Sequence, residues 1–160
     1  MANLKDVTKN PSTVGYEFPA VAVDVTKDMI RRYAESSFDF NPLHLDDDWM
    51  EDAQFGKTSF NSIIGHGLMT YSFVTRMMTD VLFPAGGWHE RCEMRFKAPV
   101  LPGDTITASG TVTHTRDEDG YVIYAADVQA TKQDGAVVAI GTAMGRMPQD
   151  GTSKLIQAQR

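Results

Sequence analysis

The stretch that decides the fold runs from Ile63 to Phe83 and reads IIGHGLMTYSFVTRMMTDVLF. It is the longest continuous apolar-rich segment of the 160 residues, and its apolar side chains fall on nearly every side of a helix. A helix with so little polar surface must be buried on most sides, and the turn PAGG at 84–87 ends it. We therefore expect one long, buried central helix, with the rest of the chain built around it.

Strands are expected on both sides of this helix along the chain. Before it, Tyr16 to Val25 has strand chemistry, and Thr26 is suited to cap a helix whose apolar and charged residues fall on opposite faces. After it come four runs with strand chemistry, separated by the turn signals PG at 102–103, EDG at 118–120 and DG at 134–135. These runs, which we expect to form an antiparallel meander, are 88–100, 104–116, 121–132 and 136–147.

An antiparallel sheet of about five strands, wrapped around the central helix, satisfies this order and makes the fold class α+β. The length and the 42% hydrophobic content fit a single domain, which we place at residues 1–148, followed by a loose polar tail at 149–160. An open sheet leaves two unpaired edges, which proteins usually cover or pair. We therefore expect a homodimer that joins two sheets, or a higher homo-oligomer.

The composition argues against several classes of partner. Fifteen Lys and Arg against 21 Asp and Glu leave a net charge of −6, which disfavours nucleic acid and anionic membrane surfaces. No apolar run reaches the length of a membrane span or resembles a signal peptide. The single cysteine, Cys92, cannot form a disulfide within the chain, and a reducing environment is the default for such a sequence. We expect a soluble, cytoplasmic protein.

The segment from Asp39 to His44, DFNPLH, carries the residues best suited to chemistry. Pro42 disfavours helix at the residue before it, so Ser36 to Leu45 is expected to be a loop. A carboxylate and an imidazole in one stiff loop can divide the roles of base and acid near neutral pH, as the addition or removal of water requires. Taken alone, the two residues fit another interpretation better, in which Asp39 caps the turn and His44 is a satisfied core histidine.

The surrounding residues favour the chemical interpretation. The string SFDFNPLHLD at 37–46 resembles the signature D-x-N-P-x-H, followed by an acidic residue, of the MaoC-like or (R)-specific enoyl-CoA hydratase family. GHGLM at 65–69 and RFKAPVLPGD at 95–104 are similar to two further motifs of that family, and the three occur in the family's order. The resemblance extends from about Tyr16 to Met147. It implies a hot-dog fold, which agrees with a sheet wrapped around one helix.

The resemblance also implies a reaction and the residues that perform it. The reaction is the reversible addition of water to a trans-2-enoyl-CoA, giving a (R)-3-hydroxyacyl-CoA, with neither a metal nor a redox cofactor. Asp39 and His44 match the catalytic pair, which would hold one water, take a proton from it and supply a proton to the α-carbon. Which of the two is base and which is acid stays open. Gly67 matches the backbone donor to the thioester oxygen, and Asn41 either contacts the water or substrate or is only a turn residue.

The remaining candidate residues are weaker. His66 either orients the site or caps the start of the central helix. Arg95 and Lys97 alternate along a strand, and they either meet the phosphates of coenzyme A or are simply solvated. The three aspartates at 46–48 fit a helix start better than a calcium site. The segment GKTSFNS at 56–62 belongs to a stretch that is longer than in short bacterial members of the family, so the acyl chain length is not predicted.

Two other functions stay open. A hot-dog acyl-CoA thioesterase usually carries its acid on the central helix, where this sequence offers only Asp80, near the far end. A non-catalytic acyl-CoA-binding module would keep the fold without turnover. Loss of an enoyl thioester, release of free thiol, and binding alone distinguish the three functions.

Overall fold

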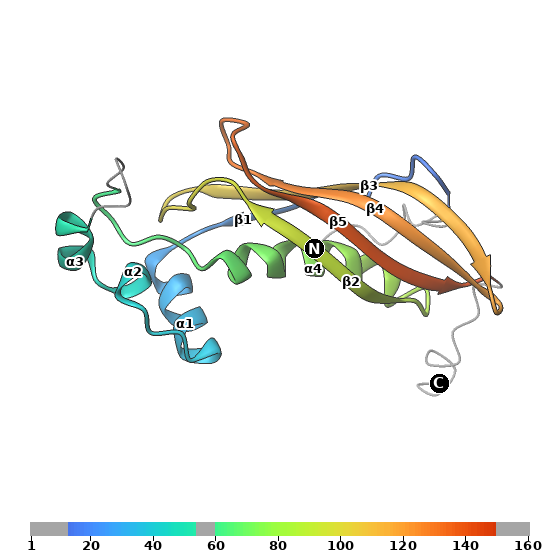
Figure 1. Cartoon of the computed structure of the whole chain (residues 1–160), viewed down its shortest axis with the longest axis horizontal. Helices are drawn as coiled ribbons and strands as arrows, with labels where there is room; N and C mark the ends of the chain where they lie inside the picture. The colour runs from blue at the N-terminus through green and yellow to red at the C-terminus, as the bar shows by residue number, and fades with distance from the viewer. Residues whose placement is uncertain (1–12, 54–59, 150–160) are drawn as a thin grey trace.

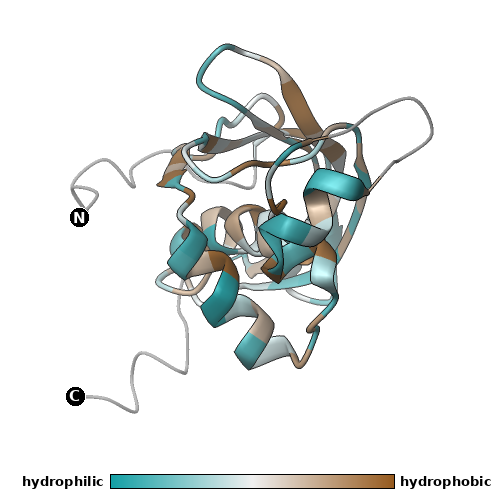
Figure 2. Ribbon diagram, turned by 90° about the vertical axis from the view of Figure 1, so that its left-hand side faces the viewer, coloured by the Kyte–Doolittle hydropathy of each residue, from teal (hydrophilic) through white to brown (hydrophobic). Residues whose placement is uncertain are grey.

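The computed structural model describes residues 13–53 and 60–149, which form a curled antiparallel sheet with one helix along its face (Figure 1). Three short helices lie together at one end; Figure 2 looks at this end, where their hydrophilic turns face outward. Most of the predicted tail (150–160) and part of the predicted long segment (56–59) lie outside the described residues. In chain order the elements are β1 (Val21–Asp24), α1 (Lys27–Ser37), α2 (Pro42–Leu45), α3 (Asp47–Asp52), α4 (Gly67–Leu82), β2 (Trp88–Phe96), β3 (Thr105–Glu118), β4 (Tyr121–Thr131) and β5 (Val137–Pro148).

The sheet formed by the described residues has the strand order β1-β3-β4-β5-β2, and every neighbouring pair is antiparallel. The predicted hairpins are confirmed. Asp119 (φ 51°) and Gly120 (φ 80°) close the turn between β3 and β4, and two positive φ values suit the twist of the flanking strands. The predicted four-strand meander is wrong in one respect, because β2 pairs with β5 and not with β3. The turn signal at 102–103 makes the chain change direction, but it does not specify which strand becomes the neighbour.

The helix α4 lies along one face of the sheet (Figure 1). The predicted burial on most sides is confirmed except along a stripe of four exposed residues, three of them polar, whose spacing of four places them on one face. The helix also begins later than the apolar stretch does, since the Gly65 N–H pairs with the Val100 carbonyl oxygen at 2.7 Å before the first helical turn. No described helix has the length and apolarity needed to cross a membrane. The exposed stripe is Leu68, Ser72, Arg76 and Asp80, and the buried residues are Met69, Thr70, Val74, Met77, Met78, Val81 and Leu82.

The N-terminal part differs from the sequence prediction in two places. β1 is confined to Val21–Asp24, because Pro19 has no N–H to donate to a ladder, and Glu17 makes only an isolated bridge to β3. The loop expected at 36–45 contains the one-turn helix α2, because proline suits the first position of a helix although it disfavours later ones. The predicted cap of α1 is confirmed, since Thr26 Oγ1 accepts the Met29 N–H at 3.1 Å.

Two aspartates hold the short helices against the start of α4. Asp46 ends α2 and begins α3, and its carboxylate accepts the Trp49 N–H at 2.9 Å, so the helix start predicted at 46–48 is confirmed. Asp47 pairs with Lys27 of α1 at 2.6 Å and accepts the Ile63 N–H at 3.1 Å. These contacts bring α1, α2 and the segment before α4 to one end of the sheet, where the candidate residues gather.

Candidate active site

A cavity of about 650 Å³ lies where three segments of the chain meet. They are the loop between α1 and α2, the residues that lead into α4, and the residues that follow β2. The polar part of the wall includes Asp39, His44 and His66, with Gly67 beside them. The rest is mainly apolar and includes Leu43, Phe60, Ile64, Phe96, Val100 and Val138. The structure therefore brings residues of all three sequence motifs, at 37–46, 65–69 and 95–104, to the wall of one largely apolar cavity.

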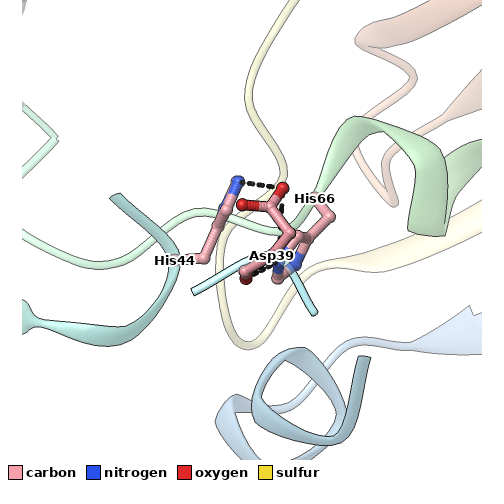
Figure 3. A group of neighbouring side chains, drawn as sticks. All are labelled: Asp39, His44 and His66. Carbon is pink, nitrogen blue, oxygen red and sulfur yellow. Dashed lines mark hydrogen bonds and ion pairs between the residues drawn. The ribbon is translucent and has the colours of Figure 1, made fainter. Parts of the chain in front are cut away.

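The His44 side chain has a defined orientation and a defined proton. It lies on α2, is 8% exposed, and places Nδ1 2.7 Å from the carbonyl oxygen of Ile64. A carbonyl oxygen only accepts, so Nδ1 carries the proton and Nε2 of the neutral ring is left as an acceptor. Nε2 lies 4.0 Å from Asp39 Oδ2 (Figure 3). Sequence reasoning missed the role of Ile64, because a main-chain carbonyl leaves no signal in a motif.

Asp39 occupies the loop between α1 and α2. The preceding residue, Phe38, ends α1 with a left-handed backbone (φ 58°), which turns the chain sharply toward the cavity. The Asp39 side chain is 53% exposed, and its Oδ1 accepts only a long hydrogen bond of 3.4 Å from the Asn41 N–H. Its Oδ2 is 4.0 Å from Nε2 of His44 and 4.0 Å from Nε2 of His66. The carboxylate is thus close to both rings without a short bond to either.

His66 is buried, with 2% of its surface exposed, and its ring stacks on that of His44 at a centroid distance of 3.7 Å and an interplanar angle of 22°. Its Nε2 lies 3.1 Å from the main-chain carbonyl oxygen of Asp39. The residue is the N-cap of α4, but its side chain makes no capping hydrogen bond, so the predicted capping role is wrong. Burial lowers the pKa of His66, against the opposing effect of the bond to Asp39. The ring is therefore neutral at pH 7.

Gly67 is the first residue of α4, where backbone N–H groups have no partner within the helix. No acceptor for its N–H occurs among the residues that the structure describes. A Cβ at this position would lie 3.0 Å from two ring carbons of Phe96, so only glycine leaves this part of the wall open. The free N–H and the positive end of the helix dipole favour an anionic or strongly polarised oxygen here.

Of the other residues predicted for the site, the structure places some in the cavity wall and others outside it. Asn41 caps α2, and its Oδ1 accepts the Leu43 N–H at 3.1 Å. Lys97 is exposed and lines the cavity, whereas Arg95 lines a different hollow of about 1170 Å³ that extends across the sheet and contains no histidine. The acid considered for a thioesterase, Asp80, lies on the exposed stripe of α4 and pairs with Arg76 at 3.5 Å. It is not part of the cavity wall.

Asp39, His44 and His66 offer one ligand atom each within 4.8 Å of one another, as a metal site requires. Their orientation is poorly suited to a metal. The rings of His44 and His66 are nearly parallel, so the lone pairs of their nitrogens do not converge on one point, and Nε2 of His66 already donates to Asp39. The arrangement suits a hydrogen-bonded pair of Asp39 and His44 with a neutral ring behind it.

Known proteins share both the sequence pattern and the fold. Residues 9–134 match the MaoC like domain family. The chain is 30% identical to the (R)-specific enoyl-CoA hydratase of Rhodospirillum rubrum, over 82% of this chain and 86% of the relative, and 31% identical to the protein of that name from Aeromonas caviae, over 74% and 84%. Its fold matches the solved (R)-hydratase from A. caviae involved in PHA biosynthesis, with a TM-score of 0.73 and 28% identity over 85% of this chain and 97% of that one. The chain therefore belongs to the MaoC-like dehydratase family, has the hot-dog fold, and is a lyase of the hydratase and dehydratase class.

Proposed function

We propose that this protein is an (R)-specific enoyl-CoA hydratase, which adds water reversibly to a trans-2-enoyl-CoA and forms a (R)-3-hydroxyacyl-CoA. The two relatives of that name support the reaction. The observation that carries the proposal is the position of Asp39 and His44, whose acceptor atoms face each other at 4.0 Å on the wall of an apolar cavity, beside the free N–H of Gly67.

The separation of 4.0 Å suits a single water held by both residues. Two hydrogen bonds of about 2.8 Å to acceptors at this spacing subtend an angle of about 90° at the water oxygen, which is close to the angle between its two O–H bonds. The water then donates one O–H to the Asp39 carboxylate and the other to Nε2 of His44. Its lone pairs are left to face the β-carbon of the substrate.

We assign the role of base to His44, and the tautomer set by Ile64 supports this assignment. His44 Nε2 takes one proton from the water as the water oxygen bonds to the β-carbon, and the electron pair of the double bond moves toward the thioester oxygen. The enolate then takes a proton at the α-carbon from Nε2 of the imidazolium. One H and one OH are added, and His44 returns to the neutral form. Asp39 takes no proton in these steps, but orients the water and stabilises the transient imidazolium.

Charge that develops on the thioester oxygen needs a donor, and we assign this role to the N–H of Gly67. The apolar part of the wall suits an uncharged acyl chain. We assign Lys97, an exposed residue of the cavity wall, to the anionic part of coenzyme A, while Arg95, in the other hollow, is left out of the proposed site. The proposed steps use only groups of the chain and water. That the reaction needs no metal or redox cofactor stays a prediction.

We also propose that the protein works as a homodimer. β1 and β2 are the edge strands of the described sheet, and the nine residues of β2 have an unpaired side. Two large apolar side chains are also exposed, Phe96 at the end of β2 and Leu68 at the start of α4. Sedimentation or light scattering of the purified protein tests this proposal.

The experiment that tests the function is incubation of the pure protein with enoyl thioesters of coenzyme A of increasing chain length. The absorbance of the conjugated thioester should fall, and chiral chromatography should identify the product as the (R)-3-hydroxyacyl thioester. Asp39→Asn and His44→Ala should each lose orders of magnitude in kcat while the substrate affinity changes little. Release of free thiol would point to a thioesterase, and binding without turnover would point to a non-catalytic module.

A further inference from the structure

His66, at the start of α4, contacts both members of the proposed catalytic pair, which lie five positions apart in the segment between α1 and α3 (Figure 3). We propose that His66 is a positioning residue that sets the separation between the Asp39 carboxylate and Nε2 of His44. The inference rests on the proposed function, since it concerns the same site. One edge of the His66 ring is hydrogen-bonded to the main-chain carbonyl oxygen of Asp39, and one face of the ring stacks on His44. The residue that follows His66 is Gly67, the proposed oxyanion donor.

Asp39 needs such a support because little else holds it. Its side chain is half exposed, and its only side-chain hydrogen bond among the described residues is the 3.4 Å contact with Asn41 in the same loop. The bond from His66 spans 27 positions of sequence and ties this loop to the start of α4. Without it, the loop after Phe38 can move away from the cavity, and the separation of 4.0 Å is no longer defined.

His66 holds His44 in a different way. The rings are stacked at 3.7 Å, while Nδ1 of His44 is fixed at 2.7 Å from the Ile64 carbonyl oxygen. A bond at one edge and a ring against one face leave the imidazole a single orientation, with Nε2 toward Asp39. Tyr33 lies on another side of His66, with a centroid distance of 4.9 Å, so His66 is itself confined.

His66 does not share the acid and base work. Its Nε2 must carry a proton to donate to the Asp39 carbonyl oxygen, so Nδ1 is the bare nitrogen of the neutral ring. Nδ1 is buried and has no partner among the described residues. A proton there would place an unpaired charged N–H in the interior, stacked on His44, and this is costly. The ring is thus a fixed neutral support that reaches the reaction only through its two neighbours.

Two substitutions separate the contacts of His66. Gln keeps an N–H near the position of Nε2 but has no ring, and Phe keeps a flat ring but has no donor. We expect His66→Phe to lower kcat about 100-fold with KM little changed, as a displacement of about 1 Å does at a reacting centre. His66→Gln should recover a large part of this loss. His114→Gln, on an exposed position of β3, is the matched control and should keep wild-type kinetics.

The double variant Asp39→Asn/His66→Phe tests the route of the effect. Because part of the effect of His66 passes through Asp39, His66→Phe should cost clearly less kcat once the carboxylate is gone than it costs in the wild type, whereas a general disturbance of the fold multiplies the two losses in full. Thermal unfolding shows whether each variant is folded, and if His66→Phe is not, His66→Gln carries the comparison. Multiplied losses, or a His66→Phe variant with wild-type kcat, would overturn the proposal.

Nitrogen NMR of the imidazole rings gives a readout that does not depend on turnover. At pH 7 the wild type should show neutral His66 protonated on Nε2, the neutral form of His44 should carry its proton on Nδ1, and the His44 signals should shift in His66→Phe. A His66 ring protonated on Nδ1, or unchanged His44 signals in the variant, contradicts the positioning role. A wild type with the expected tautomers but no activity on any enoyl thioester contradicts the proposed function alone.

Discussion

Replacing Gly67 by alanine tests the proposed oxyanion donor with the smallest possible change. The added Cβ would lie at 3.0, 3.0 and 3.2 Å from three ring carbons of Phe96. Carbon atoms in contact prefer about 3.5–4.0 Å, so the ring must retreat by about 0.5–1 Å. Phe96 is 47% exposed and can swing outward, and alanine is also the better helix former, so we expect the free energy of unfolding to change by about 1 kcal/mol or less.

The effect on the reaction should be much larger than the effect on stability. The methyl group stands where the thioester must approach the backbone N–H, and loss of one such donor typically costs about 3 kcal/mol in the barrier, or about 100-fold in kcat. The donor acts mainly on charge that develops in the transition state, so kcat should fall more than KM rises.

The assay is the initial rate of enoyl thioester loss, measured together with the thermal unfolding midpoint. Gly65→Ala is the matched control, because its Cβ would meet the flexible end of Met69 at an equal 3.0 Å, while its N–H is already bound to Val100. The variant Gly67→Ala/Phe96→Ala removes the ring that the methyl displaces and should remain slow. A Gly67→Ala enzyme as fast as Gly65→Ala, or recovery of the rate in the double variant, would show that the N–H of Gly67 is not the donor.

Three further predictions concern stability and cofactor need. Asp104→Asn should lower the free energy of unfolding by about 3 kcal/mol in chemical denaturation, because the carboxylate is buried and binds Lys132 at 2.7 Å and the Leu101 N–H at 2.7 Å; a loss under about 0.5 kcal/mol would contradict this. Burial acts to raise the pKa of Asp104, but the bonds from Lys132 and Leu101 outweigh it and lower the pKa, so this stability should be present above about pH 4 and be lost as the pH falls further. Burial lowers the pKa of His66, so below about pH 6.5 the unfolded chain binds a proton that the folded chain does not. As the pH is lowered through this range, the thermal unfolding midpoint should therefore decrease more steeply in the wild type than in His66→Gln. Equal slopes would contradict the buried neutral ring. Dialysis against a chelator should leave kcat unchanged if no metal takes part, and a loss that zinc restores would reassign the histidine pair as ligands.

Much of the fold could be predicted because its signals are local. The turn at 118–120 predicts a hairpin, since an acidic residue and glycine tolerate the positive φ values that the turn needs. Thr26 predicts the start of α1, because its hydroxyl can accept a backbone N–H three positions ahead. The neighbour of β2 could not be predicted in this way, since strand pairing depends on how the whole sheet closes over α4.

The candidate site likewise has features that local sequence predicts and features that depend on tertiary packing. The sequence by itself determined that Asp39 and His44 lie five positions apart around a proline, and that Gly67 belongs to the apolar stretch of the central helix, because motifs record residues that are close along the chain. Only the tertiary structure decided that the Ile64 carbonyl selects the tautomer of His44, and that His66 joins the loop of Asp39 to α4. It also separated Arg95 from the cavity. The physical reason is that these contacts join segments 20 or more positions apart, whose distance and orientation are set by packing around one core and by no local rule.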